Sequence, residues 1–208
     1  MMDKGDESAV SRGILVLASG SRRRYQLLKQ IGYTPNLVIP AAIDEKKLCG
    51  ETPKQLVTRL SVSKAQKVFK SHPGSIILGA DTVVAIGRRI IGKPKDLDQA
   101  ASTLGMLSGR RHRVYSGVCV LGQGKRLQRS VVTSVKFKRL GRAEIDDYLD
   151  SGEWKGKAGS YAIQGRASAF NVSIIGSYTN VVGLPLHETY LLLSSLGIQP
   201  NSATCCSL

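Results

Sequence analysis

The chain alternates between short apolar runs and stretches in which apolar residues recur every three or four positions. Short apolar runs are typical of buried β-strands, and the wider spacing is typical of amphipathic helices. We expect strands over residues 14–18, 37–39 and 75–86. We also expect helices that open at Ser21 and Thr52, because each residue supplies a capping hydroxyl before a helical stripe.

The second half of the chain adds antiparallel strands. Gly87 and Arg88 begin a turn after the run at 75–86, and a second turn separates the β-branched stretches 113–121 and 127–140. Both patterns predict hairpins. Three more helices are expected, one ending at residue 107, one over 143–149 and one ending at 196. Because two hairpins interrupt the alternation of helices and strands, we predict an α/β fold with a mixed sheet.

One carboxylate interrupts the apolar run at 75–86. Asp81, followed by Thr82, stands between two groups of apolar residues. An isolated buried charge is too unfavourable to persist, so this carboxylate must be paired, bound to a metal or used in chemistry. We therefore expect Asp81 to be the centre of a functional site.

Composition narrows the class of protein. Hydrophobic residues make up 42% of the chain and charged residues 22%, as in ordinary globular proteins. No apolar run approaches the ~20 residues that cross a bilayer. The formal net charge of +15 raises nucleic acid as a partner. Aromatic residues are only 5% and do not alternate with basic ones, so a small polyanion is favoured over a nucleic-acid polymer.

The two ends of the chain differ from the rest. Residues 1–12 are polar and lack the apolar core of a secretory signal, so we expect a disordered leader on a cytoplasmic protein. Residues 198–208 are expected to form a tail. Cys205 and Cys206 in that tail match a prenylation box poorly, and the four cysteines show no zinc spacing.

Candidate anion-binding residues gather around the predicted turns. Ser19 precedes the first helix, and Arg23 and Arg24 stand in its first turn. Backbone N–H groups at a helix mouth favour phosphate, and arginine adds a bidentate fork. The alternative is an ordinary capped helix with solvated arginines. Lys64 lies beside apolar positions of the second helix, where it snorkels to solvent or faces a cleft, and Lys93 projects from the end of the first hairpin.

These residues suit phosphate chemistry better than other reactions. Glu45 in a loop adds a second carboxylate to Asp81. Carboxylates can hold Mg²⁺, while lysines and arginines spread the charge of phosphates and fix their geometry. The sequence contains no convincing Ser/His/Asp set, no P-loop signature and no GxGxxG motif.

A series of motifs in one order resembles the Maf family of nucleoside triphosphate pyrophosphatases, over residues 14–197. The motifs are Leu17-Ala18-Ser19-Gly20-Ser21-x-Arg23-Arg24, Asp44-Glu45, Arg59-Leu60 with Lys64-Ala65, Leu78-Gly79-Ala80-Asp81-Thr82-Val83-Val84, Gly92-Lys93-Pro94, Ser108-Gly109-Arg110-x-His112, Tyr161-Ala162-Ile163-Gln164-Gly165 and Gly176-Ser177-Tyr178-Thr179-Asn180-Val181-Val182-Gly183-Leu184-Pro185-Leu186. Eight ordered motifs are far more specific than any one of them.

The resemblance implies a single unit with two lobes around an elongated mixed sheet and a cleft between them. It implies hydrolysis of a nucleoside triphosphate between the α and β phosphates, with pyrophosphate as a product. A divalent cation, Mg²⁺ or Mn²⁺, would be held by Asp81 and Glu45, which would also be the catalytic residues. The phosphate-binding residues would be Ser19, Arg23, Arg24, Lys64 and Lys93.

Three residues resemble the subgroup that acts on dTTP and UTP. Arg23, Thr82 and Gln164 match its base-specificity positions, and a side-chain amide can pair with the edge of a pyrimidine. Arg22 stands where the family usually has Pro, which adds a positive charge near the phosphates. A house-cleaning role in the nucleotide pool, a link to cell-division arrest and a homodimer are further implications. The competing hypothesis is a basic nucleic-acid-binding protein that acts in septum control without catalysis.

Overall fold

One mixed sheet runs through the whole of the structure, a computed structural model that describes residues 13–201. The predicted leader and the Cys205-Cys206 pair lie outside the described residues. The strands are β1 (Leu15–Leu17), β2 (Leu37–Val38), β3 (Ile76–Ile86), β4 (Arg89–Ile91), β5 (Arg111–Gly122), β6 (Lys125–Phe137) and β7 (Asn171–Ile175). Their order across the sheet is β2-β1-β3-β5-β6-β7, with β4 paired to β3.

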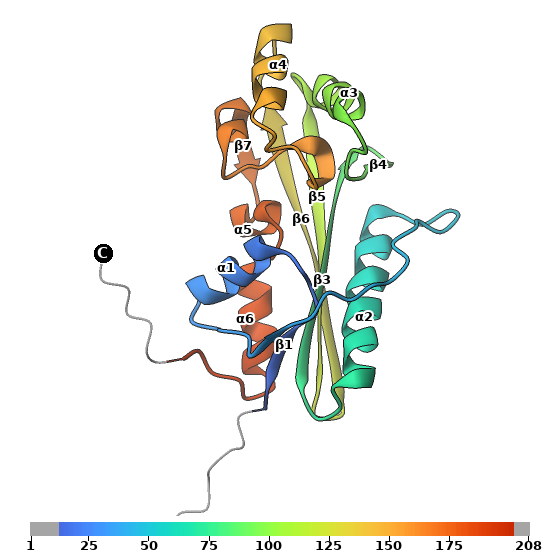
Figure 1. The fold of residues 1–208 in the computed structure, drawn as a ribbon, viewed down its shortest axis with the longest axis vertical. Helices are drawn as coiled ribbons and strands as arrows, with labels where there is room; N and C mark the ends of the chain where they lie inside the picture. Colours follow the sequence, from blue (N-terminus) through green and yellow to red (C-terminus); the bar gives the residue numbers. More distant parts are fainter. Residues whose placement is uncertain (1–12, 202–208) are drawn as a thin grey trace, which may run out of the picture.

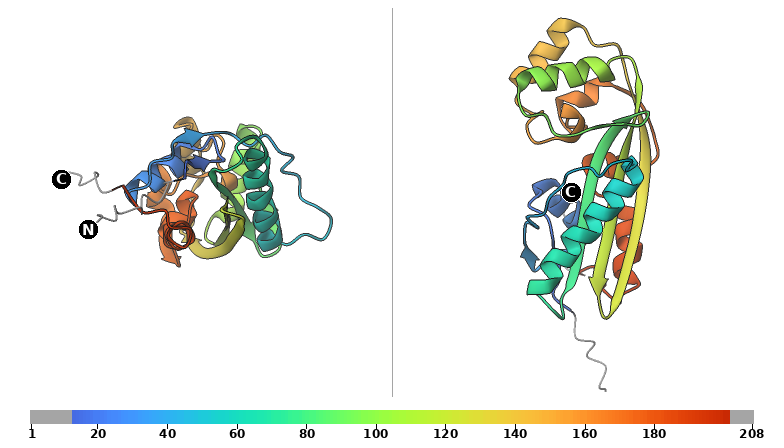
Figure 2. Two further views of the ribbon diagram at one scale, coloured as in Figure 1. Left: turned by 90° about the horizontal axis from the view of Figure 1, so that it is seen from below. Right: turned by 90° about the vertical axis from the view of Figure 1, so that its right-hand side faces the viewer.

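The helices cover the sheet at both ends. They are α1 (Arg22–Gln30), α2 (Pro53–Ser71), α3 (Leu97–Leu107), α4 (Arg142–Asp150), α5 (Tyr178–Val182) and α6 (Leu186–Ser194), with short 3₁₀ turns at Ala158–Ser160 and Arg166–Phe170. Helices α3 and α4 gather at one end (Figures 1 and 2). At the other end α2 lies on one face of the sheet, and α1 and α6 lie on the opposite face.

The predicted mixed sheet is confirmed. Strand β1 pairs in parallel with β2 and β3, whereas β3, β5, β6 and β7 pair antiparallel. Strands β3, β5 and β6 contain 11, 12 and 13 residues, so each spans about 40 Å at the usual rise per residue. These three strands continue from one lobe into the other (Figure 2).

The capping residues behave as their sequence predicts. The Ser21 hydroxyl accepts a hydrogen bond from the backbone N–H of Arg24, at the start of α1. Thr52 and Gln55 form a reciprocal capping box at the start of α2, with Pro53 as its first residue. The β7 strand and the short α5 helix were not predicted, because stretches rich in glycine and hydroxyl residues carry no clear periodicity.

Two glycines set the distance between α2 and the sheet. A Cβ atom on Gly79 of β3 would lie 2.3 Å from the carbonyl oxygen of Ser61, and one on Gly117 of β5 would lie 2.2 Å from that of Val57. Both carbonyls belong to α2, so its backbone lies directly on the sheet. This close contact brings a polar residue of the helix, Lys64, within reach of β3.

A single large apolar core fills the space between the sheet and the α1, α3, α4 and α6 helices. A smaller cluster lies between α2 and the sheet. No helix within residues 13–201 has both the length and the apolar character that crossing a membrane would require.

Candidate active site

A cavity of about 800 Å³ opens where the two lobes meet. Its walls come from the turn before α1, the middle of β3, one face of α2, the segment 40–47, the segment after β4, the loop at 156–161 and α5. Eight residues predicted for the site line this cavity: Ser19, Arg23, Arg24, Glu45, Lys64, Asp81, Thr82 and Lys93. The fold therefore assembles side chains that are up to 74 positions apart, from Ser19 to Lys93.

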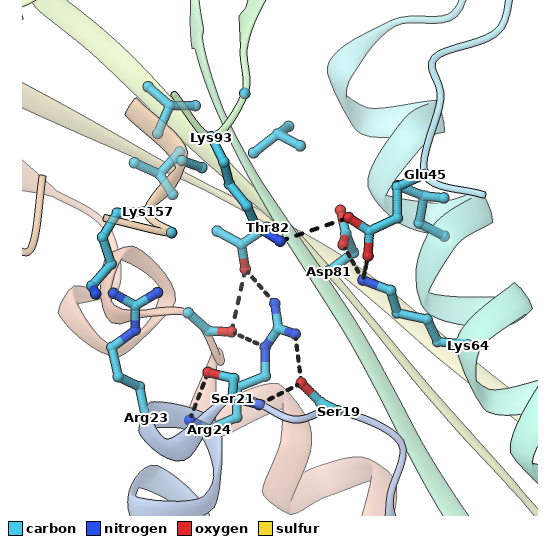
Figure 3. A pocket seen from close by; sticks show the side chains of 18 of the residues that line it. Ser19, Ser21, Arg23, Arg24, Glu45, Lys64, Asp81, Thr82, Lys93 and Lys157 are labelled. Atoms are coloured by element: carbon cyan, nitrogen blue, oxygen red, sulfur yellow. Dashed lines mark hydrogen bonds and ion pairs between the residues drawn. The ribbon is translucent and has the colours of Figure 1, made fainter. Parts of the chain in front are cut away.

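Lys64 joins the two predicted carboxylates. Its ammonium lies 2.6 Å from Oδ1 of Asp81 and 2.6 Å from Oε1 of Glu45 (Figure 3). The side chains of Lys64 and Asp81 are only 9% and 8% exposed. The buried carboxylate of β3 is therefore paired, as its setting in an apolar strand requires. Lys93 lies 3.8 Å from the other oxygen of Glu45 and stays largely exposed.

The charges around Glu45 favour its ionised form. Partial burial by itself raises the pKa of this carboxyl group. The hydrogen bond from Lys64, with the charges of Lys64, Lys93 and Arg24, outweighs burial and holds the pKa below its ordinary value. Glu45 is consequently a negative group at neutral pH, ready to share a cation.

The carboxylate pair suits a divalent cation that arrives with phosphate. No group of three or more His, Cys, Asp or Glu side chains within residues 13–201 is arranged to hold a metal. Asp81 and Glu45 nevertheless face one point, since each approaches the same Lys64 nitrogen. Mg²⁺ commonly binds through one or two carboxylates, with water and substrate phosphates as the other ligands. This donor set fits that pattern.

Arg24 connects three walls of the cavity. Its guanidinium donates hydrogen bonds to the Ser19 hydroxyl (3.0 Å), the Thr82 hydroxyl (3.2 Å) and the Gly183 carbonyl oxygen (2.9 Å). Burial lowers the pKa of Arg24, and the nearby charges of Asp81 and Glu45 partly compensate. Arg24 therefore holds the helix mouth against β3, besides lending positive charge to the cavity.

Two basic residues face the cavity from opposite lobes. Arg23 lies on α1, and Lys157 lies in the loop that follows α4 (Figure 3). Sequence reasoning did not find Lys157, because the surrounding Trp154-Lys155-Gly156-Lys157 carries no periodic or catalytic signal. Its position just before the Tyr161 motif was the one available hint.

Of the three base-specificity residues, Arg23 and Thr82 line the cavity and Gln164 does not. The Thr82 hydroxyl interacts with Ser116 (2.8 Å), Arg24 (3.2 Å) and the Gly183 carbonyl oxygen (3.2 Å), so its hydrogen bonds stay within the protein. Gln164 is exposed and does not line the cavity. The nearby Tyr161 does line it, and its hydroxyl lies 2.9 Å from Nε2 of the buried His112. The predicted roles of Thr82 and Gln164 stay predictions.

The fold and cavity define a class of protein: an α/β protein whose interlobe cleft combines two carboxylates, several cations and a helix mouth, a set suited to a polyphosphate ligand. The family described as Maf-like protein matches residues 14–196. The chain belongs to this family, and the resemblance seen in its motifs is confirmed.

Several relatives extend over nearly the whole chain. A protein of Mesorhizobium japonicum named dTTP/UTP pyrophosphatase is 56% identical over 192 residues, covering 89% of this chain and 92% of the relative. A Chelativorans protein with the same name is 52% identical, with the same coverage. A solved structure described as a HAM1 protein from Coxiella burnetii covers 87% of this chain and 98% of its own, at 14% identity and a TM-score of 0.48.

Proposed function

We propose that this protein is a nucleoside triphosphate pyrophosphatase that acts on dTTP and UTP. It hydrolyses the α–β phosphoanhydride and releases a nucleoside monophosphate and pyrophosphate. The observation that carries the proposal is the buried Lys64–Asp81 pair with Glu45 beside it, at the floor of a cationic cavity. Membership of the Maf family and the names of its relatives at 52–56% identity support the reaction.

In this reaction the protein orients the triphosphate before water attacks. Ser19 and the N–H groups at the start of α1 receive phosphate oxygens, and Arg23, Lys64 and Lys93 neutralise their charge. Asp81 and Glu45 would hold Mg²⁺ or Mn²⁺, which would supply charge to polarise the phosphate oxygens. A new bond forms between the water oxygen and the α-phosphorus. The bond from the α-phosphorus to the bridging oxygen breaks, and that oxygen leaves with pyrophosphate.

The two carboxylates also provide an acceptor for the proton of the attacking water. Lys64 engages Oδ1 of Asp81, which leaves Oδ2 available to a ligand or water. Glu45 is more exposed, with 43% of its side chain open to solvent, and its lowered pKa keeps it charged. We assign the water-activating role to this pair. The protein thereby clears dTTP, UTP and related nucleotides from the cytoplasmic pool.

The decisive experiment measures pyrophosphate release from a panel of triphosphates, with Mg²⁺ or Mn²⁺ and with chelator. We expect dTTP and UTP to be preferred and chelator to abolish turnover. Asp81→Asn should keep the fold by circular dichroism and lower turnover by a factor on the order of 10³. Asp98→Asn, an exposed residue in the first turn of α3, is the matched control and should match the wild type. Native turnover by Asp81→Asn would refute the assignment.

The Asp81→Asn variant also distinguishes the proposed enzyme from the competing hypothesis of a nucleic-acid-binding protein. A nucleic-acid-binding protein that works without catalysis would bind DNA with a steep salt dependence even as Asp81→Asn. We expect no DNA binding at moderate salt, because the charged residues predicted for the site line a concave cavity rather than a convex stripe.

A further inference from the structure

Arg23 and Lys157 form a pair of cations, and neither makes an ion pair with a carboxylate in the described part of the chain. In Figure 3 the ammonium of Lys157 lies beside the guanidinium of Arg23. The ammonium of Lys157 donates one hydrogen bond, to the Lys155 carbonyl oxygen at 3.2 Å. An ammonium has three N–H donors, so two remain for a ligand.

Holding these two charges together works against folding. Burial lowers the pKa of Lys157, and the charge of Arg23 lowers it further. Burial likewise lowers the pKa of Arg23. The charge of Glu153 raises the pKa of Lys157 but does not outweigh burial and Arg23, and the Glu153 carboxylate accepts a hydrogen bond from the backbone N–H of Arg166 at 3.0 Å. A negative ligand placed between Arg23 and Lys157 would favour the charged form of both side chains.

The loop that carries Lys157 is fixed from both sides. The Lys157 N–H donates to the carbonyl oxygen of Trp154, whose indole is buried and itself donates to Leu149. On the other side, the N–H of Gly159 donates to the carbonyl oxygen of Gly92, next to Lys93. Gly159 has φ of 73°, and a Cβ there would lie 2.8 Å from Val84. The backbone of this loop is thus held against the end of the β3–β4 hairpin.

We propose that Lys157 is a substrate-binding residue that, together with Arg23, binds a phosphate group of the nucleotide. The proposal rests on the triphosphate substrate proposed above and adds a contact from the second lobe. A phosphate bound here contacts both lobes, because Arg23 belongs to α1 and Lys157 belongs to the loop after α4. Two fixed cations match the doubly charged end of a polyphosphate better than the neutral carbonyl groups of a pyrimidine.

The test uses inorganic tripolyphosphate, which has the phosphates of the substrate without its base. Its binding to the full chain is titrated calorimetrically without added metal. Lys157→Met should weaken binding about tenfold, the value of one charge-assisted contact. Lys157→Arg should restore most of the affinity. Lys155→Met is the matched control, because it removes the same charge two positions earlier in the chain. The Lys155 side chain lies over the Trp154 ring and does not line the cavity. It should change the affinity less than twofold.

Each other outcome has a distinct meaning. The proposal would be overturned if Lys157→Met and Lys155→Met bound tripolyphosphate with equal affinity while thermal unfolding showed that both variants were folded. The proposal is also wrong if Lys157→Met binds tripolyphosphate normally but changes the preference between dTTP and dATP, since the residue would then contact the base. If the wild type binds tripolyphosphate through Lys157 yet releases no pyrophosphate from any nucleotide, the proposed function fails while the phosphate contact stands.

Discussion

Replacing Lys64 by Met tests how strongly the central charges depend on one another. The ammonium of Lys64 lies 2.6 Å from oxygens of both Asp81 and Glu45. Those two oxygens are therefore no more than about 5 Å apart, and their repulsion without the lysine is about 3 kcal/mol at an effective dielectric constant of about 20. Asp81 would in addition stay buried without a partner, a change that costs about 3–5 kcal/mol in buried pairs.

Solvent reduces the first of these contributions. The Glu45 side chain is 43% exposed and can turn away from Asp81. The unpaired buried charge of Asp81 then dominates, and we expect Lys64→Met to lower the free energy of unfolding by about 3–5 kcal/mol at pH 8. Urea unfolding followed by circular dichroism measures this value. Lys67→Met, an exposed position one turn along α2, is the control and should change stability by less than about 0.5 kcal/mol.

A second substitution isolates the electrostatic cause. In Lys64→Met with Asp81→Asn, the buried negative charge is absent, so most of the lost stability should return. Acid should have a similar effect on Lys64→Met, because a proton neutralises one carboxylate. If the double variant is no more stable than Lys64→Met, or if Lys64→Met equals Lys67→Met, the stability of this site does not depend on its charges.

Two further predictions concern the frame of the site. Gly79→Ala places a Cβ atom 2.3 Å from a carbonyl oxygen of α2, so the helix must move. The free energy of unfolding measured in urea should fall by about 2 kcal/mol, and pyrophosphate release should be lost. Gly105→Ala, in α3 with open space around it, should instead stabilise the protein by up to about 1 kcal/mol. Burial lowers the pKa of His112 to about 4, so the unfolded chain takes up a proton near pH 6.5 while the folded chain does not. The contribution of neutral His112 to stability is then fully present above pH 6.5, and the free energy of unfolding falls by about 3 kcal/mol as pH drops to about 4. His112→Gln should flatten this part of the pH profile. An unchanged slope would show that His112 does not cause the pH dependence.

Local sequence patterns decided much of the fold. Ser21 and Thr52 cap the helices that they were predicted to open, because capping needs only a hydroxyl and the next turn of chain. The long hairpin of β5 and β6 followed from β-branched runs and a Gly-rich turn. The 158–183 region was harder, since β7 and α5 are five residues each; β7 depends on pairing with β6, and α5 depends on packing against β5 and β6.

The sequence by itself indicated most of the charged groups that line this site, although not Lys157. A carboxylate in an apolar strand required a partner, and the ordered motifs indicated Glu45, Lys64, Lys93 and the helix mouth as its surroundings. Only the tertiary structure decided how these groups meet. Contact between α2 and Gly79 brings Lys64 to Asp81, Arg24 is largely used to join three walls, and Lys157 reaches the cavity from the other lobe. Such contacts join residues far apart in the chain, and no local periodicity or spacing encodes them.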